Sequence, residues 1–241
     1  MVVLCRVGAR RGADYTRALG IRDSHNIQPL RHPANTEHLF IDGPSGPLEC
    51  VIEDPDPEHD GAASAFAVIC HPHPLHQGTM HNKVAHTLAR AALGRGAPAL
   101  RFNFRGVGRS AGTHDEGSGE TDDALAAIEW MRVRHPGAEL WLMGFSFGAM
   151  VALRAAGQAE AAKLVTVAPA VTRFAADQAV APAMPWLLVQ GLADELVDAA
   201  AVRAWAAQQT PPPRLHEMPG VSHFFHGHLH ELRDAVADFL G

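Results

Sequence analysis

Short apolar runs alternate with segments of helical periodicity along most of this chain. The apolar runs that predict buried strands lie at residues 66–70, 97–104, 140–143, 164–167, 186–189 and 214–218. The helical segments lie at residues 79–93, 121–134, from 147 onward, at 198–208 and in the last stretch, up to residue 240. Strict alternation of strand and helix is typical of a parallel sheet with helices on both faces. We therefore expect an α/β fold with a mostly parallel, doubly wound sheet.

Two further strands precede this alternation. Residues 37–42 and 48–53 are joined by the turn sequence Gly-Pro-Ser-Gly at 43–46, which predicts an antiparallel N-terminal hairpin. Residues 1–34 contain six arginines and two acids and show neither period. We expect them to form a flexible extension, with one catalytic domain over residues 35–241.

The sequence Gly-Phe-Ser-Phe-Gly at residues 144–148 stands where a predicted strand passes into a predicted helix. A strand that enters a helix through Gly-x-Ser-x-Gly is a nucleophile elbow, in which a tight turn exposes the serine hydroxyl above the sheet. The pentapeptide alone is a weak signal, but its position between strand and helix strengthens it. Ser146 is therefore the candidate nucleophile.

A serine hydroxyl needs a histidine to take its proton and a carboxylate to orient that histidine. In α/β-hydrolases the acid and then the histidine follow the serine along the chain. Asp194 lies just after the strand at 186–189, with Glu195 and Asp198 as rivals, although Asp198 is better placed to cap the helix that follows. His223 follows the last predicted strand, and His226 is its rival.

Acyl transfer also needs hydrogen-bond donors for the negative oxygen of the transition state. The backbone N–H of Phe147, next to the serine, supplies one donor by position. The second is expected from the loop that follows the strand at 66–70. Pro72 and Pro74 have no N–H, so His73 is the best-placed residue, acting through its backbone and not its ring.

Beyond the elbow, four other segments carry a family resemblance. They lie at residues 71–80, 101–110, 190–194 and 220–225. Over residues 36–240 the chain resembles small, lid-less bacterial α/β-hydrolases of the serine esterase type, related to dienelactone hydrolase and acyl-peptidase-like enzymes. The resemblance implies an α/β-hydrolase fold without a cap domain. It also implies a triad of Ser146, Asp194 and His223 and an oxyanion hole formed by His73 and Phe147.

Charge and composition exclude several other classes. The net charge is −6 with histidine neutral, and the basic residues are scattered, so we expect no nucleic-acid partner. No apolar stretch approaches the roughly 20 residues that span a bilayer, and the start lacks a signal-peptide pattern, so we expect no membrane partner. Cys5, Cys50 and Cys70 are odd in number and far apart, which favours a reducing, cytoplasmic location.

Other charged and titratable residues are predicted to be structural. The acids at 120–123 are expected to cap a helix, and Arg105 and Arg109 to shape the loop that carries them.

The chain contains 16 histidines, and eight of them lie in two groups: His71, His73, His76 and His81, and His223, His226, His228 and His230. No His-Glu-x-x-His motif is present, so we expect neither a metal nor another cofactor.

These observations predict a serine carboxylesterase acting on a small-molecule ester. The short segment at 170–184 leaves no room for a helical cap, which favours small or flexible acyl groups. A thioesterase with the same triad and a non-catalytic binding protein of the same fold remain alternatives, and a homodimer is left open. Four aromatic residues are left open between a pocket and a core role: Phe145, Phe147, Phe224 and Phe225.

Overall fold

The computed structural model describes residues 35–56, 63–173 and 183–241. Its strands are β1 (Asn35–Gly43), β2 (Gly46–Asp54), β3 (Ala65–Cys70), β4 (Ala99–Phe102), β5 (Glu139–Phe145), β6 (Lys163–Val167), β7 (Trp186–Gly191) and β8 (Arg214–Met218). Its helices are the short 3-10 helix η1 (Pro74–His76) and the α-helices α1 (Lys83–Leu93), α2 (Ser118–Arg134), α3 (Phe147–Gln158), α4 (Ala199–Ala207) and α5 (Leu229–Leu240). The extension predicted at residues 1–34 lies outside the described residues, as does much of the segment at 170–184.

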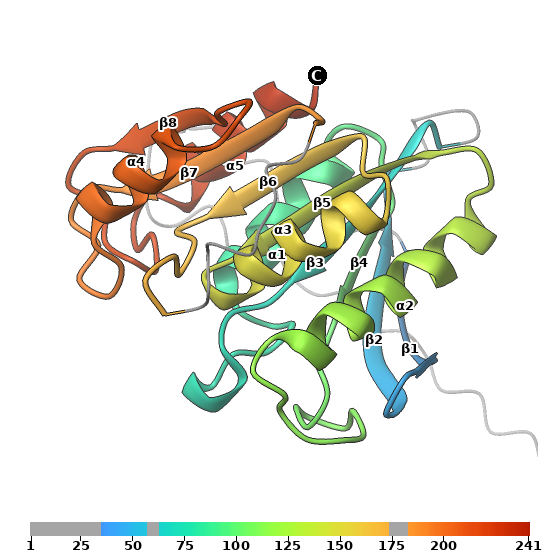
Figure 1. Cartoon of the computed structure of the whole chain (residues 1–241). Helices are drawn as coiled ribbons and strands as arrows, with labels where there is room; N and C mark the ends of the chain where they lie inside the picture. Colours follow the sequence, from blue (N-terminus) through green and yellow to red (C-terminus); the bar gives the residue numbers. More distant parts are fainter. Residues whose placement is uncertain (1–34, 57–62, 174–182) are drawn as a thin grey trace, which may run out of the picture. The chain divides into compact units, whose positions relative to one another are not determined.

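The strands of the described residues form one eight-stranded sheet in the order β1-β2-β4-β3-β5-β6-β7-β8 (Figure 1). The hairpin β1–β2 is antiparallel, with Asn35 opposite Asp54 and Gly43 opposite Gly46, and β2 pairs antiparallel with β4. From β4 onward every neighbouring pair is parallel. This arrangement confirms the predicted fold class, including the antiparallel hairpin at the start.

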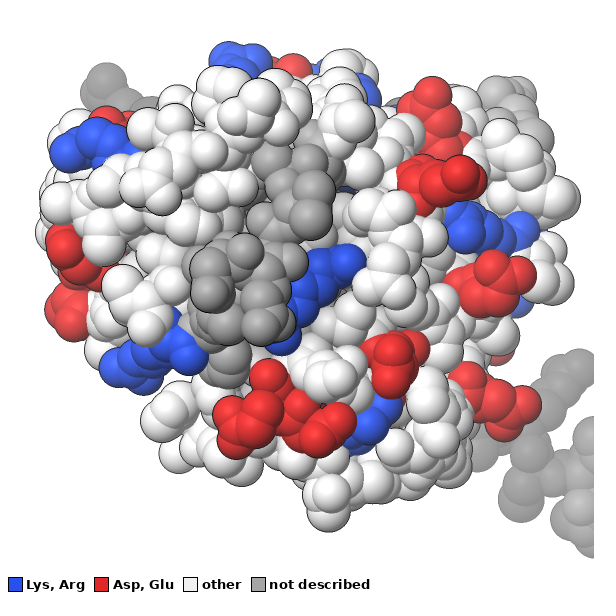
Figure 2. All heavy atoms as spheres, viewed as in Figure 1, with Lys and Arg blue, Asp and Glu red and all other residues white. Residues whose placement is uncertain are grey.

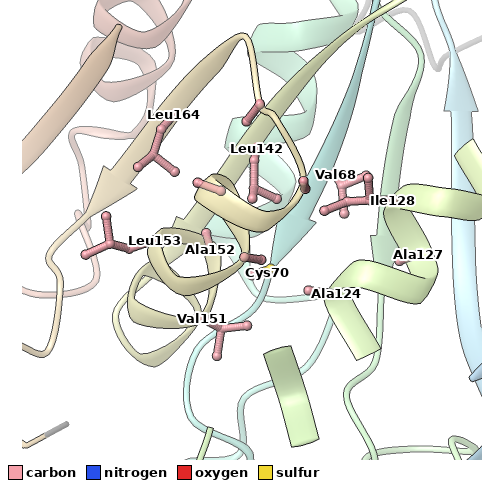
Figure 3. Packing of buried hydrophobic residues seen from close by; sticks show 14 of the residues in the cluster. Val68, Cys70, Ala124, Ala127, Ile128, Leu142, Val151, Ala152, Leu153 and Leu164 are labelled. Atoms are coloured by element: carbon pink, nitrogen blue, oxygen red, sulfur yellow. The ribbon is translucent and has the colours of Figure 1, made fainter. Parts of the chain in front are cut away.

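The parallel strands β3, β5, β6 and β7 are buried almost throughout, so both faces of the sheet are apolar there. In β3, Phe66 and Val68 pack in the core shared with α2, α3 and α4, whereas Ala67 and Ile69 pack in the core shared with α1 and α5. Helices therefore cover both faces of the sheet (Figure 1). Figure 3 shows the core on the α2, α3 and α4 side of the sheet, where side chains of α2 and α3 meet those of β3, β5 and β6.

Side-chain hydrogen bonds mark the starts of α1, α2 and α4, and two of these starts differ from the predicted ones. Helix α1 begins at Lys83 and not at residue 79, because the Asn82 Oδ1 accepts hydrogen bonds from the first free amides of the helix at 2.9 and 3.3 Å. Helix α2 begins three residues earlier than predicted, at Ser118. There the Glu120 carboxylate accepts a 2.7 Å bond from the Gly117 N–H. Asp198 caps α4 as predicted, accepting from the Ala200 N–H at 3.0 Å.

The acids at the start of α2 divide into two roles. Glu120 caps the helix as predicted, but Asp123 does not, because its fully buried carboxylate binds Arg105. The Arg105 Nη2 lies 2.8 Å from Asp123 Oδ1, and the Arg105 N–H donates to Oδ2 at 2.9 Å. Arg109 pairs in turn with Glu49 at 2.8 Å. Both arginines therefore hold the loop after β4, as predicted.

Charged side chains on the face shown in Figure 2 are dispersed. Lys and Arg side chains there are separated by neutral surface or lie beside Asp and Glu, and they form no continuous stripe. No helix in the described part of the chain combines the length and the apolar character that crossing a membrane requires.

Candidate active site

Ser146 occupies the turn between β5 and α3 in a backbone conformation that residues with a side chain rarely adopt. Its φ is 56° and its ψ is −114°. The turn is closed by the Ser146 N–H, which donates to the Val167 carbonyl of β6 at 2.8 Å. A Cβ at Gly148 would lie 2.3 Å from the carbonyl oxygens of both Cys70 and His71, so only glycine lets α3 start this close to the end of β3. The geometry is that of a nucleophile elbow.

Asp194 and His223 meet across the loops that follow β7 and β8. The His223 Nδ1 lies 2.8 Å from Asp194 Oδ2, and both side chains are almost completely buried. Gly191 permits this approach, because a Cβ there would lie 2.3 Å from the Val221 carbonyl of the other loop. The Asp194–His223 pair therefore depends on close contact between the backbones of these two loops, which a side chain at residue 191 would prevent.

Four hydrogen bonds hold the Asp194 carboxylate. Oδ1 accepts from the N–H groups of Leu196 at 2.9 Å and Val197 at 2.8 Å, and Oδ2 accepts from Gln190 Nε2 at 3.1 Å as well as from His223. Burial acts to raise the pKa of Asp194, but the bonds from His223, Val197 and Leu196 outweigh it and hold the pKa below its usual value. The group is thus an anion at neutral pH, as a partner for an imidazolium must be.

Ser146 and His223 line one cavity of about 470 Å³ at the carboxyl ends of the parallel strands. His73 and Phe147 line the same cavity. The other lining residues are Pro72, His76, Gln77, Gly78, Asn82, Ala170, Arg173, Leu196, Val197 and Phe224. The structure therefore brings together four of the five predicted site residues around this cavity, and Asp194 contacts His223 from behind.

The structure assigns different roles to the four aromatic residues that the sequence left open between a pocket and the core. Phe147 and Phe224 line the cavity, and Phe224 is 38% exposed. Phe145 and Phe225 are fully buried in the core on the α1 and α5 side of the sheet. The Phe145 ring also packs against the His223 ring, with a centroid distance of 5.0 Å. Phe145 thus supports the histidine instead of contacting a ligand.

The His73 backbone is held in place by its own loop. Its carbonyl accepts hydrogen bonds from the N–H groups of His76 and Gly78, both at 3.0 Å, and its ring Nδ1 accepts from the Leu75 N–H at 3.2 Å. The ring therefore serves as a cap for η1.

The rival residues occupy other places. Glu195 accepts a 3.2 Å hydrogen bond from the backbone N–H of His223, and Asp198 caps α4. His226 is exposed and does not line the cavity. From the sequence we did not predict Gln190, whose buried amide binds Asp194, or Arg173 in the cavity wall. The signal for Gln190 was its place directly before Gly191, at the end of a strand that leads to the acid.

Histidine, cysteine and acidic side chains form no metal-binding group of three or more in the part of the chain that the structure describes. Of the cysteines, Cys50 and Cys70 are described, and both are buried free thiols. Burial raises the pKa of Cys50 to about 12, and it also raises that of Cys70. Both thiols are therefore protonated and poor nucleophiles at neutral pH.

Comparison with known proteins places this fold in a family. A family model described as the alpha/beta hydrolase fold matches residues 69–182. XC6422 from Xanthomonas campestris, an α/β serine hydrolase without a lid, is 44% identical with a TM-score of 0.81, over 87% of this chain and 95% of that one. An α/β serine hydrolase homologue from Coxiella burnetii is 43% identical with a TM-score of 0.80, over 85% and 97%.

A further relative is similar over most of the chain. RP471 from Rickettsia prowazekii, an uncharacterized protein, is 33% identical over 212 residues, which cover 84% of this chain and 87% of the relative. The chain belongs to the α/β-hydrolase family. One of the two bacterial solved relatives is described as an α/β serine hydrolase without a lid and the other as an α/β serine hydrolase homologue, so the resemblance stated from the sequence motifs is confirmed.

Proposed function

We propose that this protein is a serine hydrolase that cleaves a carboxylic ester through an acyl-enzyme on Ser146. The observation that carries the proposal is that Ser146 and His223 line one cavity, while Asp194 binds the far side of the His223 ring. With Nδ1 committed to Asp194, Nε2 is the His223 nitrogen left to accept a proton. His223 and Asp194 thus have the arrangement of a general base and its orienting acid.

In the first half of the reaction, Ser146 Oγ attacks the ester carbonyl carbon and His223 Nε2 takes the hydroxyl proton. The carbonyl oxygen becomes negative and is stabilised by the N–H groups of His73 and Phe147. When the tetrahedral intermediate collapses, the C–O bond to the alcohol breaks and His223 gives its proton to the leaving oxygen. The products of this half are a free alcohol and an acylated Ser146.

Water completes the second half. His223 Nε2 takes a proton from a water molecule, which attacks the acyl carbon, and the second intermediate collapses to release the acid and return the proton to Ser146 Oγ. Asp194 stays ionised throughout and stabilises the imidazolium each time it forms.

The size and lining of the cavity support a small substrate. A volume of about 470 Å³ lies within the usual range of small-molecule sites, roughly 300–1,000 Å³. Leu196, Val197 and Phe224 provide an apolar wall for an acyl or alcohol chain, whereas Arg173 brings a positive charge into the lining. An ester with a short or flexible acyl group suits this site best.

The test is hydrolysis of p-nitrophenyl esters from acetate to decanoate by wild type and by Ser146→Ala, with fluorophosphonate labelling in parallel. We expect turnover that favours short chains, that is lost in Ser146→Ala, and a single label on Ser146. Matched oxygen and sulfur esters then distinguish an esterase from a thioesterase. A folded wild type that neither turns over nor takes the label would refute the proposal and favour a binding protein.

A further inference from the structure

The first histidine of the His-Pro-His-Pro sequence has no role in the steps above, yet it is completely buried beside the site. His71 follows β3 directly and has an exposed fraction of 0%. Its ring packs against the Phe104 ring with a centroid distance of 4.5 Å. Both ring nitrogens take part in hydrogen bonds to backbone groups. A buried ring with two backbone partners is a fixed part of the loop structure.

The two partners define the tautomer of His71. The Phe104 N–H can only donate, and it lies 3.1 Å from Nε2, so Nε2 is the acceptor and carries no proton. The proton of the neutral ring is then on Nδ1, which donates to the Pro72 carbonyl at 2.6 Å. Burial lowers the pKa of His71 to about 3, so this neutral form persists at physiological pH.

The Pro72 carbonyl and the His73 N–H belong to the same peptide group. A peptide group is planar, and in its trans form the C=O and N–H bonds point in opposite directions. The only cis peptide bond in the described part of the chain precedes Pro211, so this group is trans. A ring that holds the Pro72 oxygen on one side therefore fixes where the His73 N–H points on the other.

We propose that His71 is a positioning residue for the oxyanion hole, whose Nδ1–H binds the Pro72 carbonyl and so aims the His73 N–H at the developing oxyanion. The inference rests on the proposed function, since it takes His73 as an oxyanion donor. It also accounts for the order of residues in the motif: a rigid histidine, a proline whose carbonyl it holds, and then the donor.

Two variants of His71 separate this role from simple packing. In His71→Asn the side-chain amide nitrogen takes the place of Nδ1 and keeps the donor to Pro72, but the acceptor for Phe104 is lost. In His71→Gln the longer side chain brings its oxygen to the place of Nε2 and keeps the acceptor, but the donor to Pro72 is lost. Each variant loses one hydrogen bond, so the two form a matched pair for stability.

The readouts are kcat and KM for p-nitrophenyl butyrate, the inhibition constant of butylboronic acid, and the thermal unfolding midpoint. Removal of one oxyanion donor lowers kcat about 10²–10³-fold, so a misaimed donor in His71→Gln should lower it about 10- to 100-fold with KM within about twofold. The boronic acid, which forms a tetrahedral adduct on the serine, should lose affinity to the same degree. His71→Asn should stay within about threefold of wild type in kcat.

Equal kcat values for the two variants, or losses that follow only their unfolding midpoints, would overturn the positioning role. A wild type without esterase activity would instead refute the proposed function. Should either variant fail to fold, nitrogen NMR of histidine-labelled wild type decides the point. The ring proton of His71 on Nδ1, with a shift change on adding butylboronic acid, supports the proposal, and a proton on Nε2 or an unchanged shift refutes it.

Discussion

The buried ion pair between Arg105 and Asp123 allows a quantitative test of how the loop after β4 is held. The substitution Asp123→Asn keeps the size of the side chain and removes its charge. In the wild type the Asp123 carboxylate is completely buried. It accepts hydrogen bonds from the Arg105 backbone N–H and from the Arg105 guanidinium, whose Nε lies 3.1 Å from Oδ1 and 3.0 Å from Oδ2. In the variant an amide N–H₂ group replaces one of these acceptors and faces the cation.

The expected loss of unfolding free energy follows from the burial of Arg105, the charged partner that remains. The Arg105 side chain is 9% exposed, and its other ion-pair contact, with Asp115, is 4.0 Å long and involves a side chain that is 61% exposed. Breaking a buried pair by removing one charge costs about 3–5 kcal/mol of unfolding free energy. Asparagine keeps one oxygen for Arg105, so we expect the lower end, about 3 kcal/mol, or a fall of about 6–12 °C in Tm for a chain of this size.

Urea unfolding followed by circular dichroism at pH 7 measures the change, with thermal scans in parallel. Asp122→Asn is the matched control, since Asp122 is exposed on the same first turns of α2 and its loss should cost less than about 0.5 kcal/mol. The double variant Arg105→Met, Asp123→Leu should recover much of the loss, because it leaves no buried charge unpaired. An Asp123→Asn variant within about 1 kcal/mol of wild type would refute the structural role assigned to Arg105.

Two further predictions concern the loops that carry the acid and the histidine. Gly191→Ala should lower stability by about 1–3 kcal/mol and reduce ester hydrolysis, because its Cβ would lie 2.3 Å from the Val221 carbonyl. Gly157→Ala in α3, where a Cβ meets nothing within 4 Å, should instead raise stability by about 1 kcal/mol. Thermal unfolding of both variants checks the contrast, and a similar effect of the two would contradict it. The lowered pKa of Asp194 means that its ionised form stabilises the fold above the unfolded pKa of about 3.9 and that this contribution is lost as the pH falls through the lower folded pKa. Asp194→Asn should therefore destabilise the protein at pH 7 and progressively less below about pH 4, and a difference in urea midpoint that did not change with pH would contradict this assignment.

Features that depend on neighbours in the chain were predictable from the sequence. Apolar runs and helical periodicity located the strands and helices, since burial of one face repeats with the period of the element. Errors in helix starts arose because the periodic pattern does not show which side chain caps a helix, and Asn82, inside the segment predicted at 79–93, caps α1. The elbow at Ser146 was visible because its glycines stand within two residues of the serine.

Features that depend on distant partners needed the tertiary structure. The sequence put Asp194 ahead of Glu195 only by its position after a strand. In the structure, the close approach of Gly191 and Val221 brings the Asp194 carboxylate to the His223 ring, whereas Glu195 binds the His223 backbone N–H. The sequence shows which side chains can form hydrogen bonds, but it does not show which strand ends lie side by side in the fold.

The sequence by itself therefore determined the α/β class, the order of its elements, the elbow and a short list of acids and histidines, because local periodicity and turn chemistry encode them. Only the tertiary structure decided that Asp123 binds Arg105 and that the His71 ring joins the loops after β3 and β4. The physical reason is that a hydrogen bond or an ion pair forms only within about 3–4 Å, and packing of the two helical layers on the sheet decides which residues reach that distance.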